Sequence, residues 1–189
     1  MDLPSCLDCK HAEQGFPCHK ADGSYDFAKV GTALVLYGRT FSEDDAAVFD
    51  AGERAKHAWA GDCSFEVEQD YPHLLMPLIA AAMDACEAPS DAAFVAAGLL
   101  ENAIVNHGPL LISQIEALAA SSPKFRYVLS GVWARANADP DVWARVCKAA
   151  GSQGLMDTDG RGPSDGHPVT VLSEAEAVAL LQTRVATAV

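Results

Sequence analysis

The sequence is poor in positive charge. It has 13 Lys and Arg against 26 Asp and Glu over 189 residues, which gives a formal net charge of −13 at pH 7. Broad binding to nucleic acid needs clustered lysines and arginines that neutralise phosphates. We therefore expect no nucleic-acid ligand. An acidic surface suits a basic protein partner, although the same charge also serves solubility alone.

Long apolar runs are missing as well. A helix that spans a membrane needs about 20 consecutive, mostly apolar residues, and no uninterrupted run approaches that length. The first six residues, M-D-L-P-S-C, lack the basic region and apolar core of a secretory signal. These features predict a cytoplasmic protein that has no membrane partner.

Cysteines are few, but three of the six gather near the N-terminus. Cys6, Cys9, Cys18 and His19 form a C-x2-C-x8-C-H pattern. In a reducing compartment such spacing indicates metal or redox chemistry more often than a disulfide. Zinc takes four nitrogen or sulfur ligands at tetrahedral geometry, so these four residues form a candidate zinc site, with His11 or Cys63 as alternative fourth ligands. Free thiols are the competing interpretation. A thioredoxin-like redox role would need a strand–CxxC–helix context, which is not visible.

Helix start and stop signals are dense from about residue 78 to residue 150. Ser90 suits the first cap of a helix that runs toward Asn106, and Gly108 followed by Pro109 predicts its end and a new start. Ser122-Pro123 and Asp139-Pro140 each place a capping residue directly before a proline, which predicts two further helix starts. Gly151 predicts the end of the last helix in this stretch.

The remaining chain is also read as helices and connections. Helices are predicted over residues 24–38, over 42–60 and over 72–86, with 61–71 as a connector. The helix over 42–60 begins at the capping box Ser42–Asp45, and Val48, Gly52, Ala55 and Trp59 form its buried stripe. Residues 151–168 read as a loop, 169–172 as a short extended piece, and Ser173 with Glu176 as the capping box of a last helix.

Together these patterns predict an all-α fold. Antiparallel helical pairs would stack in a short, solenoid-like bundle that carries a small cysteine-rich appendage. The predicted segments are a cysteine-rich segment over 1–23, a helical domain over 24–150, and a glycine-rich loop with a capped C-terminal helix over 151–189.

The residues from Ala97 to Trp133 carry a resemblance. They read A-G-L-L-E-N-A-I-V-N-H-G-P-L-L-I-S-Q-I-E-A-L-A-A-S-S-P-K-F-R-Y-V-L-S-G-V-W, and P-D-V-W-A-R-V follows from Pro140. This run resembles a bacterial family of small helical proteins of unknown function with the pattern A-G-x-L-E, H-G, I-E-x-x-A, P-x-F-R and G-V-W. Asn102-Ala103 and Ser121-Ser122 depart from it. The resemblance implies a helical fold over about residues 97–146 and supplies no catalytic residues.

Four polar residues in this run invite two interpretations. Glu101, His107, Glu116 and Arg126 are expected to form polar pairs that fix how adjacent helices dock, because ionisable groups on packing faces need partners. The alternative is a Glu/His acid–base site. Glu101 and His107 lie six positions apart, on different faces of a helix, so cooperation would need a bend or another chain.

Two functions follow from different classes. The sequence has no G-x-S-x-G motif, no phosphate-binding glycine loop and no recognisable Cys/His nucleophile arrangement. This favours a non-enzymatic protein-binding module. Its most concrete form is an immunity protein, similar to an antitoxin, that covers the active site of a basic bacterial toxin domain. The alternative is a zinc-dependent regulator or enzyme that uses the N-terminal cysteines.

Overall fold

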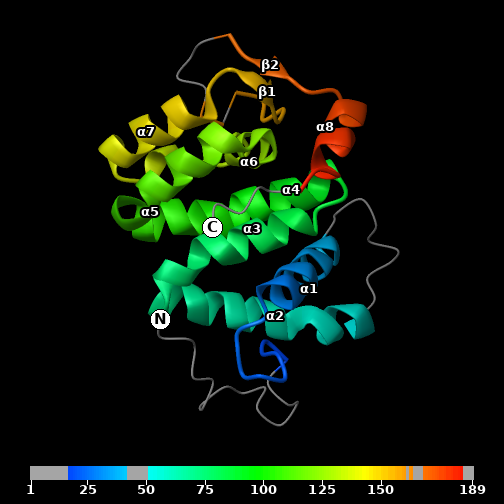
Figure 1. Ribbon diagram of the computed structural model, residues 1–189. Helices are drawn as coiled ribbons and strands as arrows, with labels where there is room; N and C mark the ends of the chain where they lie inside the picture. The colour runs from blue at the N-terminus through cyan, green and yellow to red at the C-terminus, as the bar shows by residue number, and fades with distance from the viewer. Residues whose placement is uncertain (1–16, 42–50, 161, 164–167, 185–189) are drawn as a thin grey trace. The chain divides into compact units, whose positions relative to one another are not determined.

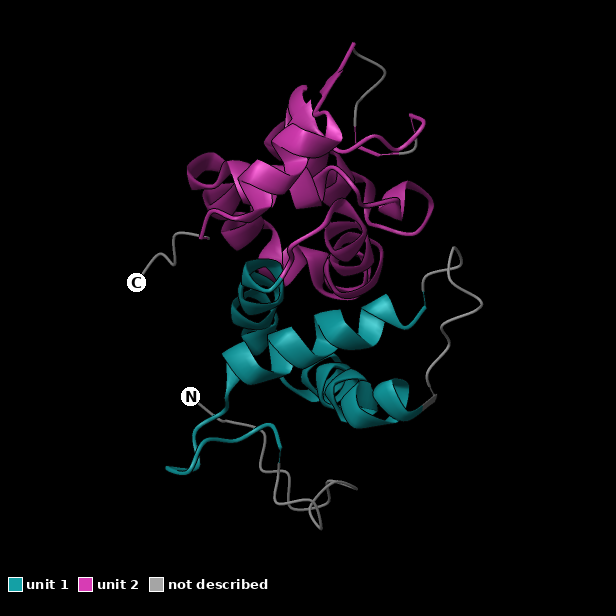
Figure 2. Ribbon diagram, turned by 90° about the vertical axis from the view of Figure 1, so that its right-hand side faces the viewer, with its two compact units in different colours: residues 1–85 teal, residues 86–189 magenta. Residues whose placement is uncertain are grey.

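The computed structural model describes residues 17–41, 51–160, 162–163 and 168–184. These residues are mostly helical, and their only strands form one two-stranded sheet. The predicted mainly α-helical fold is therefore confirmed. The chain divides into two compact units, residues 1–85 and 86–189, which Figure 2 colours separately. The solenoid-like pairing, the cysteine-rich appendage and the predicted segment boundaries stay predictions.

Unit 1 contains helices α1 (Phe27–Arg39), α2 (Ala51–Asp70) and α3 (Leu75–Asp84), with the short 3-10 helix η3 (Pro72–Leu74) leading into α3. Helix α1 packs against both α2 and α3 (Figure 1). Its start is fixed by Asp26, whose Oδ1 accepts a hydrogen bond from the Lys29 backbone N–H at 3.1 Å. This cap satisfies one of the donors that the first turn of a helix leaves free.

A glycine brings α1 and α3 into close approach. A Cβ atom at Gly31 would lie 2.6 Å from the backbone C of Ala81 and 2.6 Å from the backbone N of Ala82. Only a residue without a side chain fits there. The side chains on one face of α3 are buried, and so is Cys86 just beyond the helix. The buried members of this face are Leu75, Leu78, Ile79 and Ala82.

The connector predicted over residues 61–71 is wrong, because α2 continues to Asp70. Gly61 does not end the helix; it makes room for the Tyr37 ring, whose Cε1 would lie 3.2 Å from a Cβ at that position. The predicted stripe is also corrected, since Gly52 and Ala55 are exposed. The buried side chains of α2 recur at helical spacing instead: Trp59, Ala60, Cys63 and Val67. The capping box from Ser42 and the residue Val48 lie outside the described residues.

Unit 2 is built on a long helical stretch. Helix α4 (Pro89–Val95) passes through the π-helical turn η4 (Ala96–Leu100) into α5 (Glu101–Ser121). The other elements, in order, are α6 (Pro123–Leu129), η5 (Ala134–Ala136), α7 (Pro140–Ala150), β1 (Gln153–Leu155), β2 (Thr170–Val171) and α8 (Glu174–Leu181). Helices α6 and α7 pack on α5 and on each other (Figure 1).

The helix break predicted at Gly108 and Pro109 is wrong, because α5 runs through both residues. Its buried positions continue on either side of them at helical spacing: Ala103, Ile104, Leu111, Ile112, Ile115 and Ala119. Gly108 serves packing, since a Cβ there would lie 2.7 Å from Cγ1 of Val142 on α7. Burial of a continuous apolar stripe outweighs the one backbone hydrogen bond that an interior proline removes.

The cap predicted at Ser90 is also wrong. The N-cap of α4 is Ala88, with Pro89 at the first helical position. Asp91 contributes to this start, because its Oδ2 accepts the backbone N–H groups of Glu87 at 2.9 Å and of Ala88 at 3.0 Å. Asp91 is a buried carboxylate held by the turn that precedes its own helix.

The other three starts are confirmed. The Ser122 Oγ accepts from the Phe125 N–H, and the Asp139 carboxylate accepts from the N–H groups of Asp141 and Val142. Ser173 and Glu176 form the predicted reciprocal capping box of α8. Gly151 ends α7 with a φ of +70°, which side chains rarely tolerate.

Two buried polar contacts attach the C-terminal segment to α6. The Lys124 ammonium, at 1% exposure, donates to the carbonyls of Leu181 at 2.6 Å and Thr183 at 3.0 Å. The Ser130 hydroxyl accepts from the Met156 N–H at 2.8 Å. The predicted extended piece is β2, which pairs in parallel with β1; β1 falls in the predicted loop.

The stretch Pro89–Ser121 is long and apolar enough to cross a membrane by length and composition. Half of its most apolar window is nevertheless buried inside the protein, and the core helix of a soluble protein meets the same criteria. The predicted absence of a membrane partner stays a prediction.

Candidate functional site

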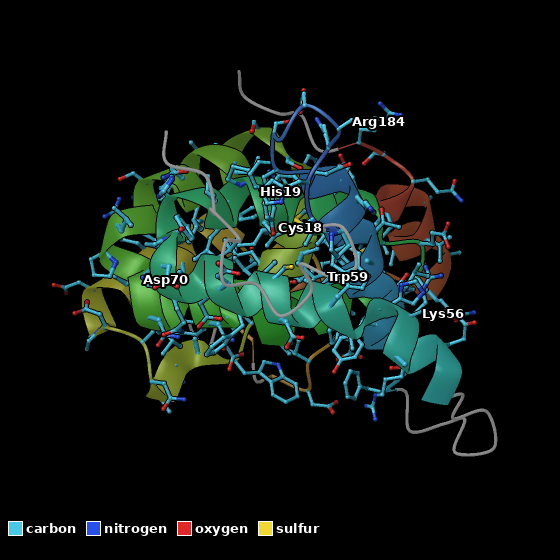
Figure 3. The ribbon with its side chains drawn as sticks, turned by 90° about the horizontal axis from the view of Figure 1, so that it is seen from below. Cys18, His19, Lys56, Trp59, Asp70 and Arg184 are labelled. Carbon is cyan, nitrogen blue, oxygen red and sulfur yellow. The ribbon has the colours of Figure 1, made fainter. Side chains whose placement is uncertain are left out.

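The described part of the predicted zinc site is a small turn that leads into α1. Cys18 and His19 precede a tight turn in which Gly23 has a φ of +82°, and His19 pairs with Tyr25 as an antiparallel bridge. The Asp26 N–H donates to the Cys18 carbonyl at 2.8 Å. These backbone bonds hold the two side chains at the entrance of α1, where Figure 3 shows them beside each other.

The Cys18 and His19 side chains converge on each other. The Cys18 Sγ lies 3.3 Å from the His19 Nδ1, and Cys18 is buried. Two donors of one tetrahedral zinc ion, at bond lengths of about 2.3 Å for sulfur and 2.0 Å for nitrogen, are separated by roughly 3.5 Å. Adjacency in the sequence therefore does not prevent this pair from facing one ion.

The remaining candidate zinc ligands are Cys6, Cys9, His11 and Cys63. Cys6, Cys9 and His11 lie outside the described residues. Cys63 is buried on α2. Across the part of the chain that the structure describes, no group of three or more His, Cys, Asp or Glu side chains is arranged to hold a metal ion.

A carboxylate of α2 lies near this turn. Burial raises the pKa of Glu66, and the nearby charges of Cys18 and Asp70 raise it further, whereas His19 lowers it. Glu66 therefore holds its proton more tightly than an ordinary surface glutamate.

The outer side of α2 carries an exposed aromatic residue among acids. Phe65 is 63% exposed, the largest value among the described large hydrophobic side chains. Asp62 lies three positions before Phe65 and Glu66 directly after it, and both are half-buried. Asp70 is exposed. We call Asp62, Phe65, Glu66 and Asp70 the α2 outer face. Figure 3 shows Asp70 toward one end of this helix and Lys56 toward the other.

A cleft lies between α1 and α2, and the sequence did not predict it. Its volume is about 570 Å³, and its lining residues are Asp26, Ala28, Lys29, Thr32, Ala33, Leu36, Lys56, His57 and Trp59. On α1, the helical spacing of Asp26, Lys29, Ala33 and Leu36 was an available signal for a shared face. The α2 residues that line the cleft could not be predicted from the sequence, because no local sequence pattern shows how α1 and α2 pack against each other.

In unit 2, the predicted polar residues connect helices, although not to one another. The Glu101 Oε2 accepts from the Trp133 N–H at 2.9 Å. The Arg126 Nη1 donates to the Ala119 carbonyl at 2.7 Å, from α6 to the last turns of α5. Trp133, which follows α6, is 46% exposed.

His107 does not join these contacts. Its Nε2 is buried and has no hydrogen-bond partner in the described structure, and no hydrogen bond links it to Glu101. The geometry therefore gives the alternative Glu/His acid–base interpretation no positive support.

Glu116 and Arg145 form a two-pronged ion pair between α5 and α7. The Arg145 Nε donates to Oε1 at 2.9 Å and its Nη2 to Oε2 at 2.5 Å. The hydrogen bond from Arg145 lowers the pKa of Glu116 below its usual 4.5. Bidentate pairs of this kind are stronger than ordinary surface ion pairs.

This pair predicts a pH dependence. Because the folded-state pKa of Glu116 is depressed, its contribution to stability is present above the unfolded pKa and is lost as pH falls through the folded value. The carbon-detected NMR titration of the Glu116 carboxylate should show the low pKa in the wild type and a return toward 4.5 in Arg145→Gln. A wild-type pKa equal to that of Arg145→Gln would contradict the pairing in solution.

Comparison with known proteins gives one match. Residues 48–154 match a family of unknown function (DUF6869). No curated protein and no solved structure matches the chain significantly. The matched range contains the α2 outer face and most of the helices of unit 2, and it leaves out Cys18 and His19.

Proposed function

The chain belongs to the DUF6869 family of unknown function, and from that premise we propose that it is a non-enzymatic protein-binding module. The observation that carries the proposal is the exposure of Phe65 at 63% on the α2 outer face. A large aromatic side chain held on a rigid helix contributes much contact area at a small entropic cost when a partner covers it.

The charges around Phe65 specify the partner. Asp62, Glu66 and Asp70 recur at helical spacing along one side of Phe65, and the whole chain carries a formal charge of −13. A basic partner would be attracted over a distance, and its encounter rate would fall as salt screens the charges. The partner is therefore a basic protein with an apolar pocket that receives Phe65.

The most concrete form of this function is an immunity protein. Under this proposal the chain covers the active site of a toxin domain encoded beside it, and the helices of both units serve as a scaffold, stacked in antiparallel pairs. An inhibitor of this kind needs a stable surface and no reactive groups of its own.

A growth assay tests the proposal. Expression of the protein encoded by the adjacent gene should arrest growth, and the wild-type chain should restore it. Phe65→Asp should abolish the rescue, because it places a charge where the partner's apolar pocket closes. The matched control Phe65→Leu keeps an apolar side chain and should retain most of the rescue. Equal rescue by wild type and Phe65→Asp would count against this surface.

A second function, zinc binding near the N-terminus, is supported by the separation of two candidate ligands. We also propose that Cys6, Cys9, Cys18 and His19 bind one structural zinc ion. The 3.3 Å separation of the Cys18 Sγ and the His19 Nδ1 supports it, because it fits two ligands of one ion. Such a site would stabilise the N-terminal segment, since metal binding and folding are coupled.

Metal analysis tests this second function. The purified wild-type protein should contain about one zinc ion per chain, and Cys18→Ser should lose most of it. Cys147→Ser is the matched control, because Cys147 is a buried cysteine on α7, far along the sequence from the candidate ligands. Zinc content that is the same in Cys18→Ser and Cys147→Ser would refute the site.

A further inference from the structure

We propose that the cleft between α1 and α2 binds a small organic anion with a flat apolar body. This site is separate from the α2 outer face, so it goes beyond the protein-binding function. Its volume of about 570 Å³ falls within the range of small-molecule sites, which extends from about 300 to 1,000 Å³.

The inner part of the cleft is apolar. Trp59 and Ala33 are buried, Leu36 is half-buried, and all three line the cavity. An indole ring beside aliphatic side chains favours a flat ring or a short hydrocarbon portion of a ligand.

The rim carries an ammonium group that pairs with no carboxylate of the described residues. Lys29 is exposed, and its Nζ lies 5.8 Å from the centre of the Trp59 ring. Across the described residues, no carboxylate forms an ion pair with it. Such a lysine is unexpected in a chain with 26 acids and 13 bases, and an anionic ligand would supply the missing partner.

The other charged groups of the rim are already engaged. The Asp26 carboxylate caps the first turn of α1, where the helix dipole offsets a negative charge. Glu53, beside the cleft, pairs with Lys56 and lies 3.8 Å from the His57 Nε2. Among the described residues, these contacts engage the acids beside the opening, and Lys29 is the lysine of the lining that pairs with none of them.

Fluorescence titration with 8-anilinonaphthalene-1-sulfonate tests the proposal, because this probe combines a sulfonate with a flat aromatic body. Its neutral analogue N-phenyl-1-naphthylamine should bind at least about tenfold more weakly if the anion is recognised. Lys29→Gln should weaken binding of the sulfonate by roughly threefold, whereas Lys56→Gln should weaken it less, because Lys56 already pairs with Glu53.

Matched variants make the result specific. Lys20→Gln removes an exposed lysine that lies outside the cleft lining, and Phe65→Asp changes the α2 outer face. Both should leave the affinity for the sulfonate unchanged within about twofold. Equal affinity for the two probes, or equal weakening by Lys20→Gln and Lys29→Gln, would overturn the proposal.

Competition separates the possible anions. Displacement of the bound sulfonate probe by phenyl phosphate but not by benzoate would assign a phosphate ester, and the reverse would assign a carboxylate. Inorganic phosphate at the same ionic strength should displace far less, because it has no apolar body. Displacement by inorganic phosphate as effective as by phenyl phosphate would contradict the predicted role of Trp59.

Discussion

Gly31→Ala is expected to destabilise unit 1 by up to about 2 kcal/mol. The added methyl group would lie 2.6 Å from backbone atoms of Ala81 and Ala82. Backbone cannot rotate aside as a flexible side chain can, so α1 and α3 must move apart. Overpacking of this kind costs about 1–3 kcal/mol or more, and the higher helix propensity of alanine offsets about 1 kcal/mol.

Urea unfolding measures this effect. Trp59 reports on unit 1 once Trp133 and Trp143 are replaced by Phe, because the other two tryptophans belong to unit 2. The control is Gly98→Ala in unit 2, whose added Cβ would meet nothing within 4 Å and which should leave the unfolding of unit 1 reported by Trp59 unchanged. It should be neutral or slightly stabilising. Unchanged stability of Gly31→Ala would show that the two helices are not in such close contact.

Lys124→Met should destabilise unit 2 by about 2–3 kcal/mol. Helix α8 should be the first element to unfold. The lysine is 1% exposed and donates to the carbonyls of Leu181 and Thr183 at the end of that helix. Charged donors to such carbonyls contribute about 1.5–3 kcal/mol, and buried acceptors that lose a donor bear a desolvation penalty. Methionine keeps most of the volume, so the lost hydrogen bonds dominate.

Hydrogen exchange can distinguish local unfolding of α8 from a loss of stability throughout unit 2. The amides of α8 should exchange faster in Lys124→Met than those of α5, because the substitution frees the C-terminal segment first. Lys148→Met removes an exposed lysine of α7 and should stay within about 0.5 kcal/mol of the wild type. If both variants behave alike, the buried lysine does not anchor α8.

Local chemistry explains which elements were predictable. The starts at Ser122, Asp139 and Ser173 depend on a side-chain oxygen that accepts a nearby backbone N–H. Such bonds form within three residues, so sequence alone reveals them. The last helix was found for the same reason, although it follows a long loop.

Tertiary packing explains the errors. Gly108 has the sequence signature of a terminator, but the approach of Val142 from another helix requires a glycine within α5. Gly61 likewise accommodates Tyr37 from α1. In both places a glycine marks close contact between helices, and only the partner element, which is remote in sequence, distinguishes this role from a helix end.

The candidate sites were predictable to different degrees. The spacing of Cys18 and His19 in the sequence pointed to a metal, and their side chains do converge. The exposure of Phe65 and the cleft beside Lys29 depend on which faces α1 and α2 bury against each other. Exposed aromatic and buried aromatic residues look alike in a sequence, so neither surface had a clear signal.

The most direct test of the central claim is calorimetric titration of the purified chain with the protein encoded by the adjacent gene, at low and at high salt. We predict a one-to-one complex whose affinity falls as salt rises and falls at least about hundredfold in Phe65→Asp, while Phe65→Leu stays close to the wild type. Binding that is indifferent to salt and to Phe65→Asp would contradict the assignment of the α2 outer face as the binding surface.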